Sequence, residues 1–525
     1  MRLAMVIRDE PQTLTHKLRV GITLTEAKRL FNAGLAIYDE GQRPHPYLAE
    51  ALPQLNSDSW RVLPDGRMET TYRLRPNLTW HDGTTLSAED FVLAWRVYTN
   101  PGELPLVTLT PQNQMEEVVA VDERTVLIRW RRLYPEAGTL REDFTPLPRH
   151  LVEQSYLHDP SDAFANHPYW SREYVGLGPY RVEGWEPGAF IDGSAFAGHA
   201  LGRPRIERIR LIFVSDVNTV IANLLSGSAH MLLDHSQFRF QQGAILQRQW
   251  AASNDGAVLL EPTNLRPVQI QFRPELVNPR SILDLRVRKA LFHSIDRQAL
   301  IDAQLDGQGL AMDTMVSRQA PYFEEVDRVI AKYPYDLRRA DQLLQEAGYI
   351  KGPDGFYTSS TEGRFSMEVR ASAGTQNEQD LAIMTDGWQR MGIDATPHPF
   401  PTVRLQDGQF RASFPALQLN MGGADEGILR SNLANGSIPR PENRWTGSNR
   451  GGWNSPEFDR LLEAFESTLD RRDRDLLVVQ MARLISEELP VLTLYYDYNV
   501  RAHLNRLRGP RLGGGSWNVH EWEWR

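Results

Sequence analysis

Residue patterns that mark common catalytic sites do not occur in this sequence. It contains no His-Glu-x-x-His zinc motif, no Walker A loop and no Gly-x-Ser-x-Gly nucleophile elbow. Cysteine is absent, which excludes disulfides, thiolate metal sites and a cysteine nucleophile. Because catalytic triads assemble in space and not along the chain, these observations favour binding over catalysis without deciding between them.

Three short stretches resemble reactive or cofactor sites and have simpler interpretations. The segment from Gly176 to Arg181 lacks the third glycine of a dinucleotide fingerprint, and Pro179 would interrupt the helix that this fingerprint requires. His81-Asp82 and Asp234-His235 could each contribute to a metal site, but a hydrogen-bonded or solvated histidine is the commoner role. We therefore predict no catalytic residue, no cofactor and no metal.

One loop has the composition of a ligand contact. Asn420-Met421-Gly422-Gly423-Ala424-Asp425 follows the strand-like run from Ala416 to Leu419. Two adjacent glycines after a strand allow backbone N–H groups to approach a ligand closely. An ordinary loop is the alternative. We predict ligand contacts at Asn420, Met421, Gly422, Gly423 and Asp425.

Two further segments could present side chains to a ligand. Asp234, His235 and Phe238 follow the strand-like run from Met231 to Leu233, and a plain surface loop is the alternative. Trp445 and Trp453 flank a polar, glycine-rich loop that spans residues 446–452. Such rings either line a cavity or pack in a core, and we predict that both line the ligand site.

The elements that must position these loops are organised around residues 258–272. Pro262, Asn264 and Pro267 keep this backbone extended, and Val268, Ile270 and Phe272 alternate with glutamines as in a half-buried strand. We interpret the segment as a crossover between two lobes, although two strands joined by a proline-rich turn fit the local pattern equally well. A second extended segment, residues 489–500, favours the crossover, because two crossings form a hinge beside a cleft.

Other elements follow from local pattern. Ser87 and Asp90 form a capping-box pair at the start of a helix that contains Trp95. The remaining predictions are a strand at 1–8, a helix at 26–38, a strand at 67–74, a hairpin at 118–130 that turns at 122–124, and a turn at Pro187-Gly188.

Composition limits the class of protein. A chain of 525 residues is too long for one core, so two or three domains are expected. The net charge of −9, with both signs interspersed, argues against nucleic acid as the main partner. No apolar run is long enough to span a membrane. Residues 1–8 are too short and too charged for a signal peptide.

Several motifs in order resemble one known family. The stretch from Tyr72 to Gly83, followed by Leu86 to Val92 and Trp95, resembles the signature of family 5 solute-binding proteins, the extracytoplasmic peptide receptors of ABC importers. Further landmarks that match this family are Leu48-Ala49-Glu50, Gly176 to Val182, Leu225 to Ala229, Asp284 to Ile301, Tyr335 to Tyr349 and Trp453 to Leu462. Together they cover essentially the whole chain.

The resemblance implies an α/β, two-lobed periplasmic-binding-protein (Venus-flytrap) fold with an extra inserted subdomain. The expected divisions are lobe I at 1–30, 171–265 and 491–525, the inserted subdomain at 31–170, and lobe II at 266–490. Ligand would lie in the cleft between lobes, enclosed by hinge motion. The resemblance adds Thr23, Leu24 and Thr25 to the predicted ligand contacts, because the family's first lobe meets ligand there.

The function implied is capture of a peptide or another small polar solute and its delivery to an ABC permease in the membrane. A monomer is expected, located in the periplasm or outside the cell, with a lipid anchor as one form of attachment. Members of this family also take nickel chelates, haem, opines and oligosaccharides. Two alternatives stay open, namely a hydrolase acting on peptide or sugar in the same cleft and a cytosolic ligand-sensing module.

One departure from the family pattern predicts ligand chemistry. Receptors of this family that grip a free peptide N-terminus carry an aspartate a few residues after a tryptophan in the loop after the lobe II strand. Met421 occupies the matching position here, and no tryptophan precedes it. We therefore predict that binding does not depend on a free α-ammonium group, and that the Gly422-Gly423 backbone donates to ligand oxygens.

Overall fold

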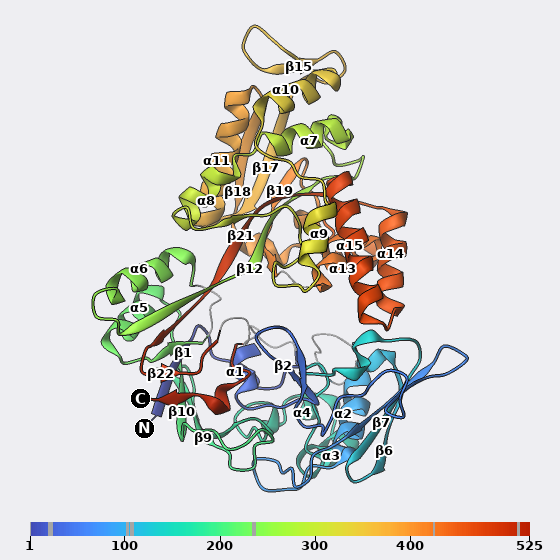
Figure 1. Cartoon of the computed structure of the whole chain (residues 1–525), viewed down its shortest axis with the longest axis vertical. Coiled ribbons are helices and arrows are strands. Elements are labelled where there is room, and N and C mark those ends of the chain that lie inside the picture. Colours follow the sequence, from blue (N-terminus) through green and yellow to red (C-terminus); the bar gives the residue numbers. More distant parts are fainter. Residues whose placement is uncertain are drawn as a thin grey trace. The chain divides into compact units, whose positions relative to one another are not determined.

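Two long strands, β12 (Gly256–Ile270) and β21 (Val491–Leu504), each contribute to both of the units into which the chain divides. The computed structural model describes residues 2–18, 25–100, 104, 110–233, 238–423, 426–511 and 515–525. Unit 1 comprises Met1–Glu261, Ser467–Leu469 and Asn499–Arg525, and unit 2 comprises Pro262–Glu466 and Asp470–Tyr498. The backbone therefore passes between units inside each of these two strands (Figure 1).

Unit 1 is built on a mixed sheet whose strand order is β21-β11-β1-β10-β9-β8, with a separate four-stranded sheet in the order β4-β5-β7-β6. The central strand β1 pairs in parallel with both β10 and β11, and its side chains from Leu3 onward are buried. Its strands and helices are β1 (Arg2–Ile7), α1 (Thr25–Arg29), β2 (Ala36–Tyr38), β3 (Pro44–Pro46), β4 (Trp60–Val62), β5 (Met68–Arg73), α2 (Ala88–Thr99), β6 (Met115–Asp122), β7 (Thr125–Trp130), α3 (Arg149–His158), α4 (Ser161–Ala165), β8 (Tyr180–Glu186), β9 (Phe190–Ala195), β10 (Arg208–Phe213), α5 (Val217–Ser226), β11 (Met231–Leu232), α6 (Phe240–Trp250), β22 (Leu507–Arg508) and β23 (Glu523–Trp524).

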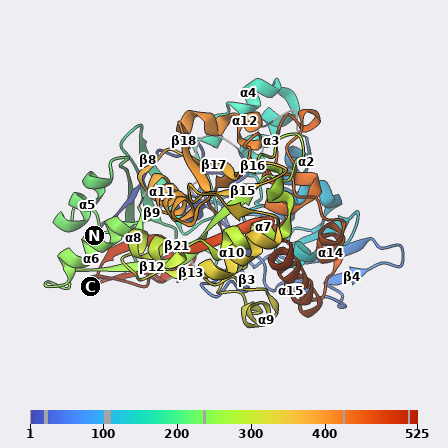
Figure 2. The ribbon, with the colours of Figure 1, turned by 90° about the horizontal axis from the view of Figure 1, so that it is seen from above.

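Unit 2 places its sheet strands in the order β18-β17-β19-β12-β21, with β13 paired to β21 and β20 paired to β12. Helix α11 packs on β17 and β18, α10 packs on α7, and α15 packs on α9 (Figure 2). Its strands and helices are α7 (Leu285–His293), α8 (Arg297–Leu305), β13 (Leu310–Ala311), α9 (Phe323–Val329), α10 (Leu337–Glu346), β14 (Ile350–Lys351), β15 (Tyr357–Ser359), β16 (Gly363–Arg364), β17 (Ser366–Ser372), α11 (Thr375–Met391), β18 (Asp394–Phe400), α12 (Gly408–Ala412), β19 (Leu417–Leu419), β20 (Gly422–Gly423), α13 (Gly427–Leu433), α14 (Pro456–Ser467) and α15 (Arg471–Glu488).

The helix predicted at 26–38 is wrong beyond its first turn. Helix α1 ends at Arg29, and the last three residues of the predicted span form strand β2. The Asn32 side chain donates to the carbonyl of Lys28 at 2.9 Å, the acceptor that the Asn32 N–H would use in a continuing helix, and also to the carbonyl of Leu14 at 2.7 Å. Asparagine competes with helical hydrogen bonds in this way.

Other local predictions are confirmed. Helix α2 starts with the predicted capping box, in which the Ser87 N–H donates to a carboxylate oxygen of Asp90 at 2.8 Å. Strands β6 and β7 form the predicted hairpin, and Asp122 pairs with Thr125 across its turn. Strand β1 lies within the predicted 1–8, and β5 lies within the predicted 67–74.

Strand β12 is extended throughout, as its prolines predict, but its burial differs from the prediction. The apolar run from Val258 to Leu260 is typical of a short buried strand, but it is only half-buried. Gln269 and Gln271, predicted on a solvated face, are buried because the segments that contain Ser448 and Phe414 lie against them. Their amide groups donate to the backbone carbonyls of Ser448 at 2.8 Å and Phe414 at 2.6 Å, respectively, so the polar side chains replace water with protein partners.

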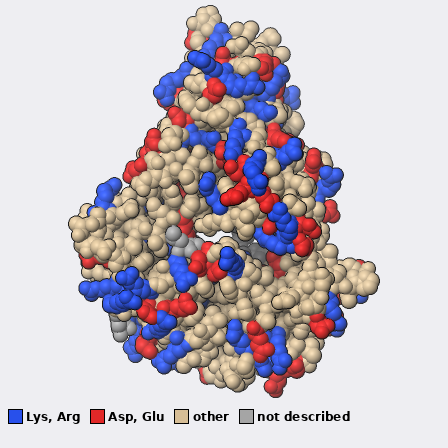
Figure 3. All heavy atoms as spheres, in the orientation of Figure 1, with Lys and Arg blue, Asp and Glu red and all other residues tan. Residues whose placement is uncertain are grey.

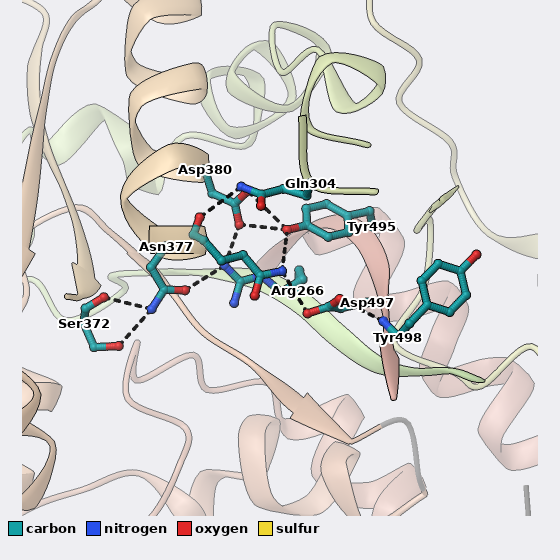
Figure 4. A network of polar contacts seen from close by, with 9 residues as sticks. Arg266, Gln304, Ser372, Asn377, Asp380, Tyr495, Asp497 and Tyr498 are labelled. Carbon is teal, nitrogen blue, oxygen red and sulfur yellow. Dashed lines mark hydrogen bonds and ion pairs between the residues drawn. The ribbon is translucent and has the colours of Figure 1, made fainter. Parts of the chain in front are cut away.

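A buried polar network joins β12 and β21 to the helices of unit 2 (Figure 4). Arg266 on β12 is 2% exposed and donates to the carboxylate of Asp380 on α11 at 2.5 Å. Asp380 also accepts from the Gln304 amide and the Tyr495 hydroxyl, both at 3.0 Å. Burial raises the pKa of Asp380, and the charge of Arg266 acts in the opposite direction. These contacts fix where both long strands enter unit 2.

Candidate ligand-binding site

A cavity of about 260 Å³ lies in unit 2 at the end of strand β19. It is lined by Arg411 of α12, residues 420–423, one face of α13 (Gly427, Ile428, Ser431 and Asn432) and two residues of the loop at 448–450. This volume is slightly below the range of about 300–1,000 Å³ that is usual for small-molecule sites. A cavity of this volume can hold part of a ligand, such as one end of a peptide.

The backbone of residues 420–423 is held by pairing with β12. Val268 pairs with Leu419, Leu265 pairs with Gly422, and this register runs without a shift. The Asn420 N–H donates to the Pro267 carbonyl at 2.8 Å. Because hydrogen-bonded and non-hydrogen-bonded pairs alternate along an antiparallel ladder, Gly422 is committed to β12, whereas the Gly423 N–H is directed away from β12.

Gly422 packs closely against the side chain of Ile428 on α13. A Cβ at this position would lie 2.6 Å from the Cδ1 of Ile428 on α13. The glycine pair predicted from sequence therefore has a packing role at Gly422. Of the two glycines, Gly423 has the N–H that β12 does not use, so it is the one placed to donate to a ligand.

Arg411 enters the cavity from the short helix α12. Asp407 caps this helix by accepting from the Phe410 N–H at 2.9 Å. The Arg411 Nη1 donates to the Leu405 carbonyl at 3.3 Å, and its buried Nε has no hydrogen-bond partner. Burial lowers the pKa of Arg411.

Arg450 approaches from the loop that follows Ser448. Its Nη1 donates to the Asn420 side-chain oxygen at 3.4 Å. The next residue, Gly451, lies against β12, since the Phe272 N–H donates to its carbonyl at 2.7 Å and a Cβ there would lie 2.0 Å from the Ile270 carbonyl oxygen. Burial and, to a smaller extent, the positive charge of Arg411 lower the pKa of Arg450 to about 10.

The described lining therefore carries two guanidinium groups and no carboxylate. Its other side chains are neutral, and the polar ones are asparagine and serine, which both accept and donate hydrogen bonds. On the face seen in Figure 3 basic and acidic side chains are interspersed. The concentration of positive charge in the cavity departs from that pattern.

The predicted ligand contacts separate into three groups. Asn420, Met421, Gly422 and Gly423 line the cavity, and the Met421 side chain is 48% exposed. Thr23, Leu24, Asp234, His235 and Asp425 lie outside the described residues. Thr25 begins helix α1 and is half-buried, whereas Phe238 is only 2% exposed.

Neither predicted tryptophan lines the cavity. Trp453 is 4% exposed, belongs to the hydrophobic core of unit 2 and packs on Phe458, with 5.2 Å between ring centroids. Its Nε1 donates to the Glu488 carboxylate at 3.0 Å. The Trp445 carbonyl oxygen lies 2.6 Å from the Cβ position of Gly408, so its backbone supports α12. We leave both rings out of the proposed ligand contacts.

Sequence reasoning missed Arg411 and Arg450. The sequence marks the glycine-rich loop at 446–452 as a candidate, but the residues of this loop that line the cavity are Ser448 and Arg450, and neither flanking tryptophan does so. Arg411 gives no local signal, because nothing in the sequence shows which arginines lack an acidic partner in the fold.

His81 has a structural role. The Gly176 N–H donates to its Nδ1 at 3.2 Å, and its Nε2 donates to the Gly178 carbonyl at 2.9 Å. Burial lowers the pKa of His81 to about 4, which matches a neutral ring with this tautomer. The described residues contain no group of three or more His, Asp or Glu that could hold a metal ion.

Comparison with known proteins identifies relatives along most of the chain. Residues 50–436 match the family described as bacterial extracellular solute-binding proteins, family 5 Middle. The chain is 22% identical to oligopeptide-binding protein AppA of Bacillus subtilis over 520 residues, covering 95% of this chain and 87% of AppA. It is 23% identical to heme-binding protein A of Haemophilus influenzae over 474 residues, covering 86% and 80%.

A solved structure shares the fold. The crystal structure of NikA from Brucella suis in complex with Fe(III)-EDTA superposes with a TM-score of 0.78 at 18% identity and covers all of both chains. At this identity the likeness concerns the fold alone. It confirms the two-lobed α/β fold predicted from sequence.

Proposed function

Because this chain belongs to family 5 of the bacterial extracellular solute-binding proteins, we propose that it captures a peptide or a related small polar solute and delivers it to the permease of an ABC importer. Members of this family are substrate-binding receptors, and they are periplasmic or extracellular. Within the described residues, no helix combines the length and the apolar character that a membrane span needs. Attachment through a lipid anchor is part of the proposal.

The observation that carries this proposal is the cavity at residues 420–423. It combines a glycine backbone held by strand pairing with neutral polar side chains and two arginines. A few polar groups that converge on a preformed cavity are the usual design of a small-molecule site. The relatives named for oligopeptides and for haem support a peptide or another small solute as the ligand of the present chain.

Native mass spectrometry of the purified protein tests the proposal directly. We expect a bound mass that is released on denaturation, or retention of peptides from a tryptic digest of casein. Retained peptides should be recovered intact, since a receptor leaves its ligand unchanged. Cleavage of the retained peptides would favour the alternative of a hydrolase, and an empty protein that retains nothing would contradict a peptide receptor.

A further inference from the structure

We propose that the solute taken into this cavity carries an anionic group, a carboxylate or a phosphate, that binds between Arg411 and Arg450. This inference rests on the proposed function in one respect, because it takes the cavity at residues 420–423 as a ligand site. It goes further by assigning the chemical class of the group that enters the cavity. The inference follows from charge, hydrogen-bond capacity and the chemistry of the lining.

Charge is the first argument. Arg411 and Arg450 line one cavity, and neither makes an ion pair with a described carboxylate. Among the other partly buried arginines of unit 2, Arg297 pairs with Asp313 at 2.8 Å and Arg266 pairs with Asp380 at 2.5 Å. Arg288 instead donates to the backbone carbonyls of Ile282, Leu283 and Glu488, so that several acceptors surround its guanidinium. Bringing two like charges together away from water is unfavourable unless an anion neutralises them. The pair is therefore incomplete without an anion.

Hydrogen-bond capacity is the second argument. A guanidinium has five N–H donors, and in this cavity Arg411 and Arg450 each direct one described side-chain hydrogen bond to a protein acceptor, at 3.3 Å and 3.4 Å. The Arg411 Nε is buried without a partner. Carboxylate and phosphate oxygens accept two parallel hydrogen bonds from a guanidinium, so they match these unused donors.

The rest of the lining fits the same group. Asn432, Ser431 and Ser448 can donate to an anion, and the Gly423 N–H is directed away from the strand that uses Gly422. An ammonium group placed here would meet two positive charges. The cavity thus selects against the free amine that other members of this family grip in the corresponding loop, and it selects for an acid.

The test uses one peptide mixture in two chemical forms. A tryptic digest of dephosphorylated casein is applied with its carboxyl groups free or converted to methyl esters, and the retained peptides are counted by mass spectrometry. Wild-type protein should retain the free acids about tenfold or more better than the esters, and a tenfold ratio corresponds to about 1.4 kcal/mol of binding free energy. Equal retention of both forms would overturn the inference while leaving the proposed receptor function intact.

Variants assign the effect to the two side chains. Arg411→Gln, Arg450→Gln and the double variant should lose the preference for free acids, and Arg450→Lys should keep part of it because the charge remains. The matched control is Arg460→Gln on α14, whose side chain is 75% exposed and 3.9 Å from Glu457. Circular dichroism and melting temperature establish that each variant is folded. A preference unchanged in the double variant would place the anion elsewhere and overturn the assignment.

A second measurement covers a solute that is not a peptide. Citrate and inorganic phosphate are compared at an ionic strength held constant with sodium chloride, and thermal unfolding is followed. We expect at least one anion to raise the melting temperature of the wild type and not of the double variant. If the digest is not retained in either form, the peptide function fails, and this measurement alone decides the inference. No difference between wild type and double variant would then overturn it.

Discussion

Replacing Asp380 with Asn removes the carboxylate that pairs directly with Arg266, while Asp497 on β21 is a further carboxylate whose charge favours the Arg266 cation. Arg266 is 2% exposed and Asp380 is fully buried, so water cannot take the place of the lost carboxylate. Asn also has one oxygen where Asp380 offers two, and these two oxygens accept from Arg266, Gln304 and Tyr495. Breaking a buried ion pair by removing one partner costs about 3–5 kcal/mol. For a domain of this size, the melting temperature should fall by about 6–20 °C.

Asp386→Asn is the matched control, since it makes the same substitution on the same helix, α11. Asp386 is exposed and pairs with Arg390 at 2.7 Å one turn away. Surface pairs of this kind contribute about 0.3–0.5 kcal/mol, so the control should be nearly neutral. Differential scanning calorimetry of the three proteins measures the difference. If Asp380→Asn unfolds within 2 °C of Asp386→Asn, about the effect of 1 kcal/mol, the network does not stabilise unit 2 as argued.

Three further changes have distinct expected results. Arg266→Met removes the cation that opposes the effect of burial on the pKa of Asp380. A carboxyl whose folded pKa lies above its unfolded pKa contributes its full stabilisation below the unfolded value, and this contribution is lost as the pH rises through the folded pKa. The free energy of unfolding of the variant should therefore fall as the pH rises above about 4. Urea titrations across this range check the trend, and a profile parallel to that of the wild type would refute it. Trp453→Ala should cost about 3–5 kcal/mol of stability through the core, while Trp453→Phe should lose mainly the hydrogen bond to Glu488; equal melting temperatures for wild type and Trp453→Ala would return the ring to the ligand site. Calorimetry with matched free and N-acetylated peptides should give similar affinities. A tenfold preference for the free amine, about 1.4 kcal/mol, would contradict this expectation. If Asp425→Asn abolished that preference, Asp425 would be the residue that binds the ammonium group.

Local sequence rules predict the parts of this fold that depend on neighbouring residues. The capping box at Ser87 and Asp90 and the turn between β6 and β7 are confirmed, because each forms within a few residues of chain. The helix expected at 26–38 fails, because the Asn32 side chain bonds the Leu14 carbonyl, a partner outside the local window. The half-buried pattern expected at Gln269 fails because Ser448, 179 residues later in the chain, lies against this side chain.

The candidate site shows the same division. The glycines at 422–423 were predictable, since a glycine pair after a strand has a local conformational meaning. Arg411 and Arg450 were not predictable, because the observation that singles them out is that neither pairs with a described carboxylate. Whether Arg411 or Arg450 has an acidic partner is decided by segments that are distant in the sequence. The same holds for Arg266, whose partner on α11 lies more than a hundred residues along the chain.

The membership of β21 in two units has a consequence for synthesis of the protein. Strand β11 of unit 1 pairs with β21 through Met231 opposite His503 and Leu232 opposite Ala502. On the ribosome, residues up to Glu261 therefore emerge long before the strand that lies beside β11, and all of residues 262–466 are translated in between. We expect unit 1 to expose the unpaired edge of β11 to chaperones until translation has passed residue 503, and unit 2 also lacks its part of β21 until residue 498 has been translated.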